Sequence, residues 1–526
     1  MFYKKMGMKK LVIIIILSAA FNAFAQDWPL KSLVIKNHSN QTAFSPITAF
    51  TFIADKPLLN RGTYQELRLN ASFSKQLLDQ KPAAIQIKIP LGKTKSITCE
   101  LVKFSLGNVI FTENNNGVIE NVKIPLTYRG VVLGDANKNM VTLTVNDEYI
   151  SLVASLSDKV IQVTKADEES SNTYRLYNSD KVQFPIQNFE CGNKEKLTSQ
   201  SANGILLNGT RESPIALQDK CINVFVDCFD SLFINQSSNT QKTINYVYEL
   251  FNSVATGFYN DTVNVQITTI NVWTTMDPYR GDTRENALYD LGNYWKDNFW
   301  GNICVGLDFG AKGRSGIAGG IGRVKAVSTN TCPAFQYGGT DSLSASCYND
   351  LNYSVNVLNF PTGPNTTQQQ VYLVMHEMGH LLGAHHTKWC GWKLSSNPDV
   401  YGTIDSCGKI EGTCMQGPPP TSNGATIMSY CLSNSTNGNY VNYLNGFGKL
   451  PGNAIRNFIE QSACLLNCSD CFGWLYKTNN DYHAYNFKET SAGIKYIESA
   501  AEKTNKSPGK LPDNNESIFI SQKTKR

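Results

Sequence analysis

Residues 376–386 read HEMGHLLGAHH. His376 and His380 are four residues apart, so on a helix both imidazoles stand on the same face, one turn from each other. Two histidines in that arrangement can bind a single zinc ion. Glu377 lies next to the first of them, where its carboxylate can act as general base on a zinc-activated water. The spacing therefore predicts a helix, which we place over residues 366–384, that carries a catalytic zinc site.

A third histidine follows after a predicted turn. Gly383 comes three residues after His380, and glycine readily takes the left-handed backbone conformation that ends a helix. The turn returns His386 to the metal, and the spacing selects it over its neighbour His385. The chain has only 6 histidines and four lie in this stretch, so the cluster is not incidental. The sequence predicts one zinc ion held by His376, His380 and His386.

The full pattern, H-E-x-x-H-x-x-G-x-x-H, resembles that of the metzincin clan of zinc endopeptidases, whose second signature is a methionine turn beneath the metal. Residues 426–431, TIMSYC, resemble that turn. The resemblance implies that Met428 forms a hydrophobic floor under the zinc ligands. It implies an α+β fold: a layered catalytic domain with a twisted mixed sheet and an active-site helix, preceded by a β-rich propeptide domain. The implied activity is hydrolysis of peptide bonds in protein or peptide substrates, with Glu377 as general base.

Within the clan the chain is most similar to the reprolysins, the adamalysin-like proteases, and in particular to secreted bacterial ones. The similarity covers roughly residues 213–470 and, more weakly, the region before them. The stretches that carry it are YRGVV (128–132), VTLTV (141–145), YVYELFN (246–252), VWT (272–274) and GIAG (316–319).

Two positions depart from the reprolysin pattern. Thr387 stands where reprolysins usually have aspartate, and Thr426 stands where they often have cysteine. Tyr430, two residues after the turn methionine, is instead similar to a tyrosine of astacins and serralysins that contacts zinc or the reaction intermediate. Tyr430 is therefore a candidate metal ligand or oxyanion donor. The alternative is a tyrosine that only packs in the core.

The N-terminus has the three parts of a secretory signal peptide. Lys9 and Lys10 precede an apolar run at 11–20, and Ala-Phe-Ala at 23–25 offers a cleavage site. The run is shorter than the ~20 residues that span a membrane, so we expect cleavage rather than a retained anchor. No later segment is long and apolar enough to span. We therefore expect a secreted or cell-surface protein without a transmembrane segment once the signal is removed.

Export makes the 14 cysteines candidates for disulfides. Twelve of them lie between Cys221 and Cys471, and an even number permits complete pairing. Cys464, Cys468 and Cys471 are spaced somewhat like metal ligands, but in an exported chain disulfides are favoured.

Cys191 lies at the end of the β-rich region, in the sequence Glu190-Cys191-Gly192. In the proteases that the chain resembles, a propeptide cysteine binds the catalytic zinc as thiolate and blocks the water position. Complete pairing of the other twelve would leave Cys191 available for this role. The alternatives are a disulfide between Cys99 and Cys191, or neither arrangement.

The chain divides into four parts. After the signal peptide at 1–25, residues 26–200 are β-rich, with alternating strands predicted at 84–89, 141–145 and 160–163. A polar stretch at 194–208 is typical of a linker. Residues 201–471 form the predicted catalytic domain, where strands at 221–226 and 263–273 alternate with helices at 241–258 and 284–298. The tail at 472–526 is lysine-rich and loses apolar periodicity beyond 502, so we expect part of it to be disordered.

Charge excludes some classes of partner. The formal net charge is +5, but residues 1–25 hold four lysines and no acid, which leaves +1 for the remainder. This gives no reason to expect nucleic-acid binding. Residues 201–471 carry 15 basic and 20 acidic groups, and residues 26–200 carry 20 basic and 17 acidic groups. The opposite signs favour docking of the propeptide on the enzyme.

The glycine-rich stretch GIAGGIG at 316–322 lacks the strand, loop and helix context of a nucleotide site. The resemblance places it near an edge strand of the active-site cleft, where an extended peptide can pair. A plain loop is the alternative.

Other functions remain open to the sequence. A metzincin-fold protein can lose activity and serve in binding or adhesion, and a zinc hydrolase can act on a non-peptide bond. Nothing in the sequence supports a calcium site. A monomer is the default expectation, and the pocket behind the zinc is shaped by the segment between Cys390 and Cys431.

Overall fold

The computed structural model describes most of the chain from residue 28 to residue 485. The signal peptide predicted at 1–25, the linker at 194–208 and the tail beyond 485 lie outside the described residues. The described residues are 28–58, 61–70, 72–115, 117–166, 172–182, 190–191, 219–279, 283–295, 299, 301–310, 315–324, 352–358, 366–396, 398–421, 423–431, 441–462, 465, 467–468, 474–478 and 481–485.

The N-terminal region is built on a ten-stranded sheet in the order β1-β4-β5-β8-β9-β10-β11-β12-β3-β2. Only the β1–β4 pair is parallel. The strands are β1 (Ser45–Ile47), β2 (Phe50–Leu58), β3 (Gly62–Leu69), β4 (Ala84–Pro90), β5 (Ser96–Phe104), β8 (Leu126–Val132), β9 (Met140–Val145), β10 (Ile150–Ser155), β11 (Val160–Lys165) and β12 (Thr173–Asn178).

This region also contains two helices that the strand pattern of residues 26–200 did not predict. α2 (Pro29–Ser39) begins with a proline in its first turn, where the missing N–H costs nothing. α3 (Phe73–Gln80) is a short amphipathic helix that buries Phe73 and Leu77 in the core of the sheet.

A second sheet, of eight strands, forms the centre of the catalytic region in the order β13-β17-β18-β16-β14-β15-β6-β7. β14, β15, β16 and β18 are parallel, and β17 runs antiparallel to β18. The strands are β6 (Ile110–Glu113), β7 (Gly117–Val118), β13 (Glu190–Cys191), β14 (Cys221–Cys228), β15 (Asn264–Val272), β16 (Ile303–Asp308), β17 (Ser315–Ala318) and β18 (Tyr353–Val357).

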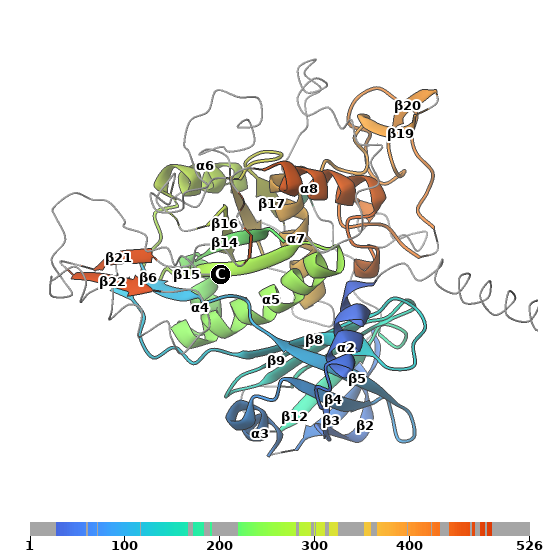
Figure 1. The fold of residues 1–526 in the computed structure, drawn as a ribbon, viewed down its shortest axis with the longest axis vertical. Coiled ribbons are helices and arrows are strands. Elements are labelled where there is room, and N and C mark those ends of the chain that lie inside the picture. The colour runs from blue at the N-terminus through green and yellow to red at the C-terminus, as the bar shows by residue number, and fades with distance from the viewer. Residues whose placement is uncertain are drawn as a thin grey trace, which may run out of the picture.

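Helices cover both faces of this sheet. Successive residues of a strand point to opposite faces: Val224 and Val226 of β14 share a core with α5 (Thr240–Asn260) and α7 (Thr366–Leu381). Phe225, between them, packs against Trp295 of α6 (Arg284–Trp295) on the other face. Figure 1 shows α5 lying between the second sheet and the N-terminal one.

The remaining elements are α4 (Asp230–Asn235), the hairpin of β19 (Trp392–Ser396) and β20 (Asp399–Gly402), the 3-10 helix η4 (Tyr443–Asn445), α8 (Lys449–Gln461), and a second hairpin of β21 (Trp474–Thr478) and β22 (Asp481–Tyr485). Among the described residues, no helix is both long and apolar enough to cross a membrane.

The cysteines correct one expectation. Disulfides join Cys221 to Cys468, Cys390 to Cys414 and Cys407 to Cys431. Cys228 and Cys304, however, are buried thiols, so complete pairing of the twelve cysteines is wrong. Both lie in strands buried on both faces, where a cysteine packs as a small apolar side chain.

Candidate metal centre and active site

α7 carries the first three residues of the motif into the core. His376, Glu377 and His380 are fully buried. The helix ends at Leu381, and Gly383 has a φ of +99°, a value that strains any residue with a Cβ. Its N–H donates to the carbonyl of His380 at 2.9 Å. The chain therefore turns directly after the second histidine and returns toward it.

The three histidine rings lie close together. The ring centroid of His376 lies 4.9 Å from that of His380 and 5.2 Å from that of His386. The Nε2 atoms of His380 and His386 are 3.0 Å apart. His385 instead stacks on Trp389, with ring centroids 3.7 Å apart. The structure thus places His386, which the spacing selected, beside the other two histidines and leaves His385 outside the cluster.

Hydrogen bonds at the other ring nitrogens fix which atom faces the centre. The Nδ1 atom of His376 bonds the carbonyl of Ile427 at 2.8 Å, and that of His380 bonds the carbonyl of Ala384 at 2.8 Å. The Nδ1 atom of His386 bonds the Glu411 carboxylate at 2.9 Å. Since these partners accept, each Nδ1 is the donor and each Nε2 presents a lone pair to the shared centre.

Electrostatics favour the neutral rings that a metal requires. Burial lowers the pKa of His376 and His386 well below the usual range for histidine. The positive charge of Lys388 acts in the same direction on both rings. Three imidazoles whose Nε2 atoms face one another form a donor set suited to a cation.

Cys191 supplies a fourth donor atom. Its sulfur lies 3.6 Å from His380 Nε2 and 3.6 Å from Glu377 Oε2. The ligand atoms of Cys191 and the three histidines all lie within 4.8 Å of one another. β13 places the cysteine there, because it pairs in parallel with β17 and sets Cys191 opposite Gly316. Three nitrogens and one sulfur fit four-coordinate zinc.

The position of Cys191 also decides whether it forms a disulfide with Cys99. Cys99 lies in β5, in the core of the N-terminal sheet, and both cysteines are thiols. The Cys99–Cys191 disulfide considered from the sequence is therefore not formed.

Glu377, on α7, has its carboxylate beside Gly316 of β17 and near the histidines. Among the described residues its Oε1 atom has no hydrogen-bond partner. Burial raises the pKa of this carboxyl to about 8, and the charge of Arg284 opposes that rise. A Cβ on Gly316 would come 2.4 Å from Oε1, so this glycine gives the carboxylate its space. The glycine-rich stretch therefore begins with an edge strand at the site rather than a plain loop.

The methionine turn lies directly below the histidines. Met428 is fully buried, and a Cβ on Gly379 would come 2.8 Å from its sulfur. The main chain of the turn takes part as well: Ile427 accepts from His376, and the Met428 carbonyl accepts from the N–H of Thr387 at 3.0 Å. The turn is thus bonded to one of the histidines and to the residue that follows another.

Tyr430 reaches the centre from the far end of the turn. Its hydroxyl lies 3.5 Å from His386 Nε2 and donates to the carbonyl of Cys191 at 3.4 Å. Burial raises the pKa of Tyr430, so the phenol keeps its proton and acts as a donor. The Lys388 ammonium lies 3.3 Å from the centroid of its ring.

Glu411 is a residue of the site that the sequence did not reveal. Its carboxylate bonds His386 Nδ1 and lies 3.3 Å from Lys388 Nζ. Its backbone is fixed by bonds to Lys388 and Cys390, and Cys390 is joined to Cys414 by a disulfide. The carboxylate that orients the third histidine comes from a loop 25 residues downstream. The only sequence feature that could have indicated this role is its position as an acidic residue between Cys390 and Cys414.

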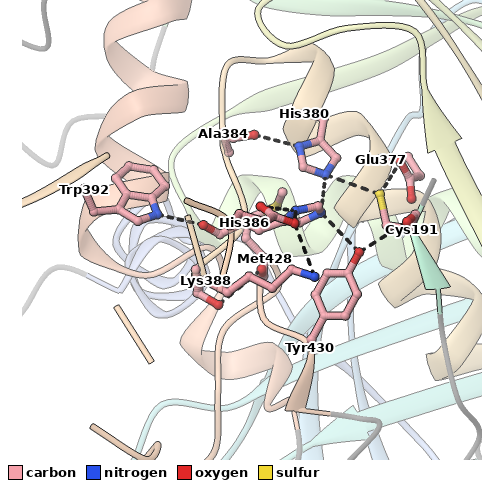
Figure 2. A network of polar contacts seen from close by, with 11 residues as sticks. Cys191, Glu377, His380, Ala384, His386, Lys388, Trp392, Met428 and Tyr430 are labelled. Carbon is pink, nitrogen blue, oxygen red and sulfur yellow. Dashed lines mark hydrogen bonds and ion pairs between the residues drawn. The ribbon is translucent and has the colours of Figure 1, made fainter. Parts of the chain in front are cut away.

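The carbonyl of His386 is held as well. It accepts a hydrogen bond of 2.7 Å from the indole of Trp392, at the start of β19 (Figure 2). The third histidine is therefore fixed at its ring and at its backbone by the segment between Cys390 and Cys431.

Comparison with known proteins shows the class to which this site belongs. Residues 218–442 match the family model Reprolysin_5, described as metallo-peptidase family M12. A solved structure of metalloproteinase-II from Bacteroides fragilis aligns over 58% of this chain and 81% of that chain, with 14% sequence identity and a TM-score of 0.33. The fold is the α+β metzincin fold, and residues 218–442 are similar to the metzincin-type metallopeptidases of family M12. This similarity supports a peptidase that depends on a metal ion.

Proposed function

We propose that the protein is a secreted zinc-dependent endopeptidase, made as a latent precursor. The observation that carries this proposal is the convergence of three imidazole nitrogens and one thiol on a single buried point, beside a carboxylate. The family assigns a metallopeptidase. The chemistry of the donor set supports zinc as the metal, since nitrogen and sulfur are its preferred ligands.

His376, His380 and His386 would hold the ion. Zinc bound there supplies a Lewis acid that polarises the scissile carbonyl and makes water a better nucleophile near neutral pH. The bonds to Ile427, Ala384 and Glu411 keep each ring in the tautomer that binding needs.

Glu377 is the proposed general base. Its Oε1 atom is buried and is available to accept a proton from the attacking water. The raised pKa of the carboxyl suits a group that must take up that proton and later give it to the leaving amine. Tyr430, as a protonated phenol beside His386, is the proposed donor to the oxyanion of the tetrahedral intermediate.

Cys191 is the proposed cause of latency. Its sulfur lies 3.6 Å from His380 Nε2, where it would be a fourth zinc ligand, and β13 covers the edge of β17, where an extended substrate would pair. In this proposal residues 26–200 are the propeptide, residues 201–471 the catalytic domain and residues 472–526 a tail. The three disulfides of the described residues agree with export through the signal peptide predicted at 1–25.

A peptide digest with and without a chelator tests the proposed activity. The protein freed of residues 26–200 should cleave a mixture of unstructured peptides, a chelator should slow cleavage at least ~100-fold, and added zinc should restore it. Cleavage that a chelator leaves unchanged would contradict the metal-dependent mechanism. Stoichiometric zinc without any cleavage would favour the binding or adhesion protein instead.

Glu411→Gln tests how the third histidine is held. The amide keeps the size of the side chain but lacks the charge that stabilises the Nδ1–H donor of His386, so zinc affinity should fall about 10–100-fold. Competition with a chromophoric chelator measures that affinity without reference to activity. Glu460→Gln, an exposed carboxylate on α8, is the matched control and should bind zinc normally. Equal affinity in both variants would remove Glu411 from the site.

A further inference from the structure

One hairpin of the N-terminal region leaves its own sheet and joins the catalytic one. β6 and β7, which we call the clamp hairpin, lie between β5 and β8 in sequence. β6 nevertheless pairs in parallel with β15, with Ile110 opposite Thr269 and Glu113 opposite Val272. Figure 1 shows β6 beside β15, away from the other strands of the N-terminal region. The catalytic sheet is therefore extended at this edge by a strand from the N-terminal region.

Side chains reinforce the pairing along the strand. Thr112 donates to the Asn271 carbonyl oxygen at 2.8 Å, and Asn271 in turn donates to the fully buried Asp227 at 2.7 Å. At the turn of the hairpin, Asn114 exchanges bonds of 2.9 Å with the hydroxyl and the N–H of Thr274. Asn114 has a φ of +50°, a conformation that asparagine tolerates better than most residues. The hairpin thus has a matched receiving surface on β15 and the residues that follow it.

The clamp hairpin also contributes to the hydrophobic core of the catalytic region. Phe111 and Leu106 belong to that core cluster and not to the cluster under the N-terminal sheet. The Phe111 ring stacks near Tyr248 of α5, with centroids 6.4 Å apart. Burial of a phenylalanine in this way stabilises a contact much more than an exposed polar pair does.

A second contact joins the N-terminal sheet to α5. Part of it is apolar, since Val131 and Met140 share a core cluster with Tyr259 at the end of α5, and part of it is polar. Ser151 donates to Glu249 at 2.6 Å, and the Asn252 amide donates to the Leu143 carbonyl at 3.0 Å. Polar groups on this face of α5 can be hydrated if the N-terminal region leaves. The clamp hairpin is separate from the metal centre, since β6 and β17 lie on opposite sides of the strands β14, β15, β16 and β18.

We propose that the clamp hairpin is a docking strand that keeps the N-terminal region bound to the catalytic region after the chain between them is cut. The receiving surface is the edge of β15, and its occupant is the clamp hairpin of the same chain, β6 and β7. The inference rests on the proposed latent precursor. It adds that blocking and retention are separate: Cys191 blocks the metal, and the hairpin retains the region that carries Cys191. A cut within 194–208 then leaves the enzyme latent until the N-terminal region dissociates or is degraded.

Effective concentration gives the physical reason. Two linked contacts on one region hold each other in place, so loss of the peptide connection alone removes neither. Main-chain pairing at a sheet edge with buried side chains on one face is a mode by which separate chains bind tightly. Weakening the hairpin should therefore change the rate at which the cut region leaves.

The experiment uses the full chain with a recognition site for a specific protease introduced within 194–208. After cutting, size-exclusion chromatography measures how fast the N-terminal fragment separates from the catalytic fragment, and a peptide assay follows activity. The wild-type fragments should elute together and stay latent. Thr112→Val combined with Asn114→Ala, which removes side-chain bonds but leaves Phe111 in the core, should speed release at least about tenfold.

Controls separate this proposal from the proposed function. Phe111→Asp is a stronger disruption, and Ile53→Asp, on the exposed surface of β2, is its matched control and should retain the fragment. Wild-type fragments that separate as fast as those of the double variant would overturn the clamp. Retention together with full activity would support the clamp and contradict the block by Cys191. Faster release of the N-terminal fragment from the double variant, without any cleavage of peptides, would support the clamp and contradict the proposed peptidase activity.

Discussion

The Glu377→Gln enzyme should bind one zinc ion as wild type does and cleave peptides at least about 10³-fold more slowly. Glutamine has nearly the shape of glutamate, so it fits the space that Gly316 leaves beside the helix. It cannot take up a proton, and the other carboxylate beside the histidines, Glu411, is bound to His386 Nδ1. The substitution should therefore lower turnover and leave zinc binding unchanged.

Two measurements decide this prediction. The value of kcat/KM is measured on protein freed of the N-terminal region, and zinc content is measured by mass spectrometry on the same sample. Glu460→Gln again serves as control, since it makes the same chemical change on the surface. Wild-type turnover in Glu377→Gln would falsify the general-base mechanism, and loss of zinc would mean that the residue acts through the metal site instead.

The uncut Cys191→Ser precursor should be active, with at least about tenfold more cleavage than the uncut wild-type precursor. A thiolate is a strong zinc ligand and a serine hydroxyl is a weak one, so the fourth position should open to water and substrate. β13 still covers the edge of β17 in this variant, which keeps activity below that of the mature enzyme. A fluorogenic peptide assay on uncut protein measures the difference.

Cys99→Ser is the matched control for this variant. Cys99 is a second buried thiol of the N-terminal region, and burial raises its pKa to about 12. It lies in the core of the N-terminal sheet, so its loss can weaken folding but cannot open the metal site. Latency that persists in Cys191→Ser would remove the thiol from the mechanism. Equal activation in both variants would mean that loosened packing, and not a lost ligand, releases the enzyme.

The centre was predictable where the chemistry is local in sequence. The spacing of His376, His380 and His386 depends on one helix and one turn, and the structure brings all three together. The turn at Gly383 has the backbone conformation that the sequence implied. Helices and strands with strong apolar periodicity, such as α5 and β14, also lie close to their predicted bounds.

What escaped prediction depends on contacts between distant parts of the chain. Glu411 acts on His386 only because a disulfide-closed loop returns to it. β6 is four residues long and has no pattern that distinguishes a strand of one sheet from a strand of the other. The thiols of Cys228 and Cys304 show why an even number of cysteines does not establish complete pairing.

Zinc K-edge X-ray absorption on the uncut precursor tests the central claim most directly, because it counts the atoms bound to the metal. The account predicts three nitrogen ligands at about 2.0–2.1 Å and one sulfur at about 2.3 Å. In Cys191→Ser the sulfur should be absent and the nitrogens unchanged. A wild-type spectrum without sulfur, or a sulfur that remains in the variant, would contradict the claim that Cys191 and the three histidines hold the zinc of the latent enzyme.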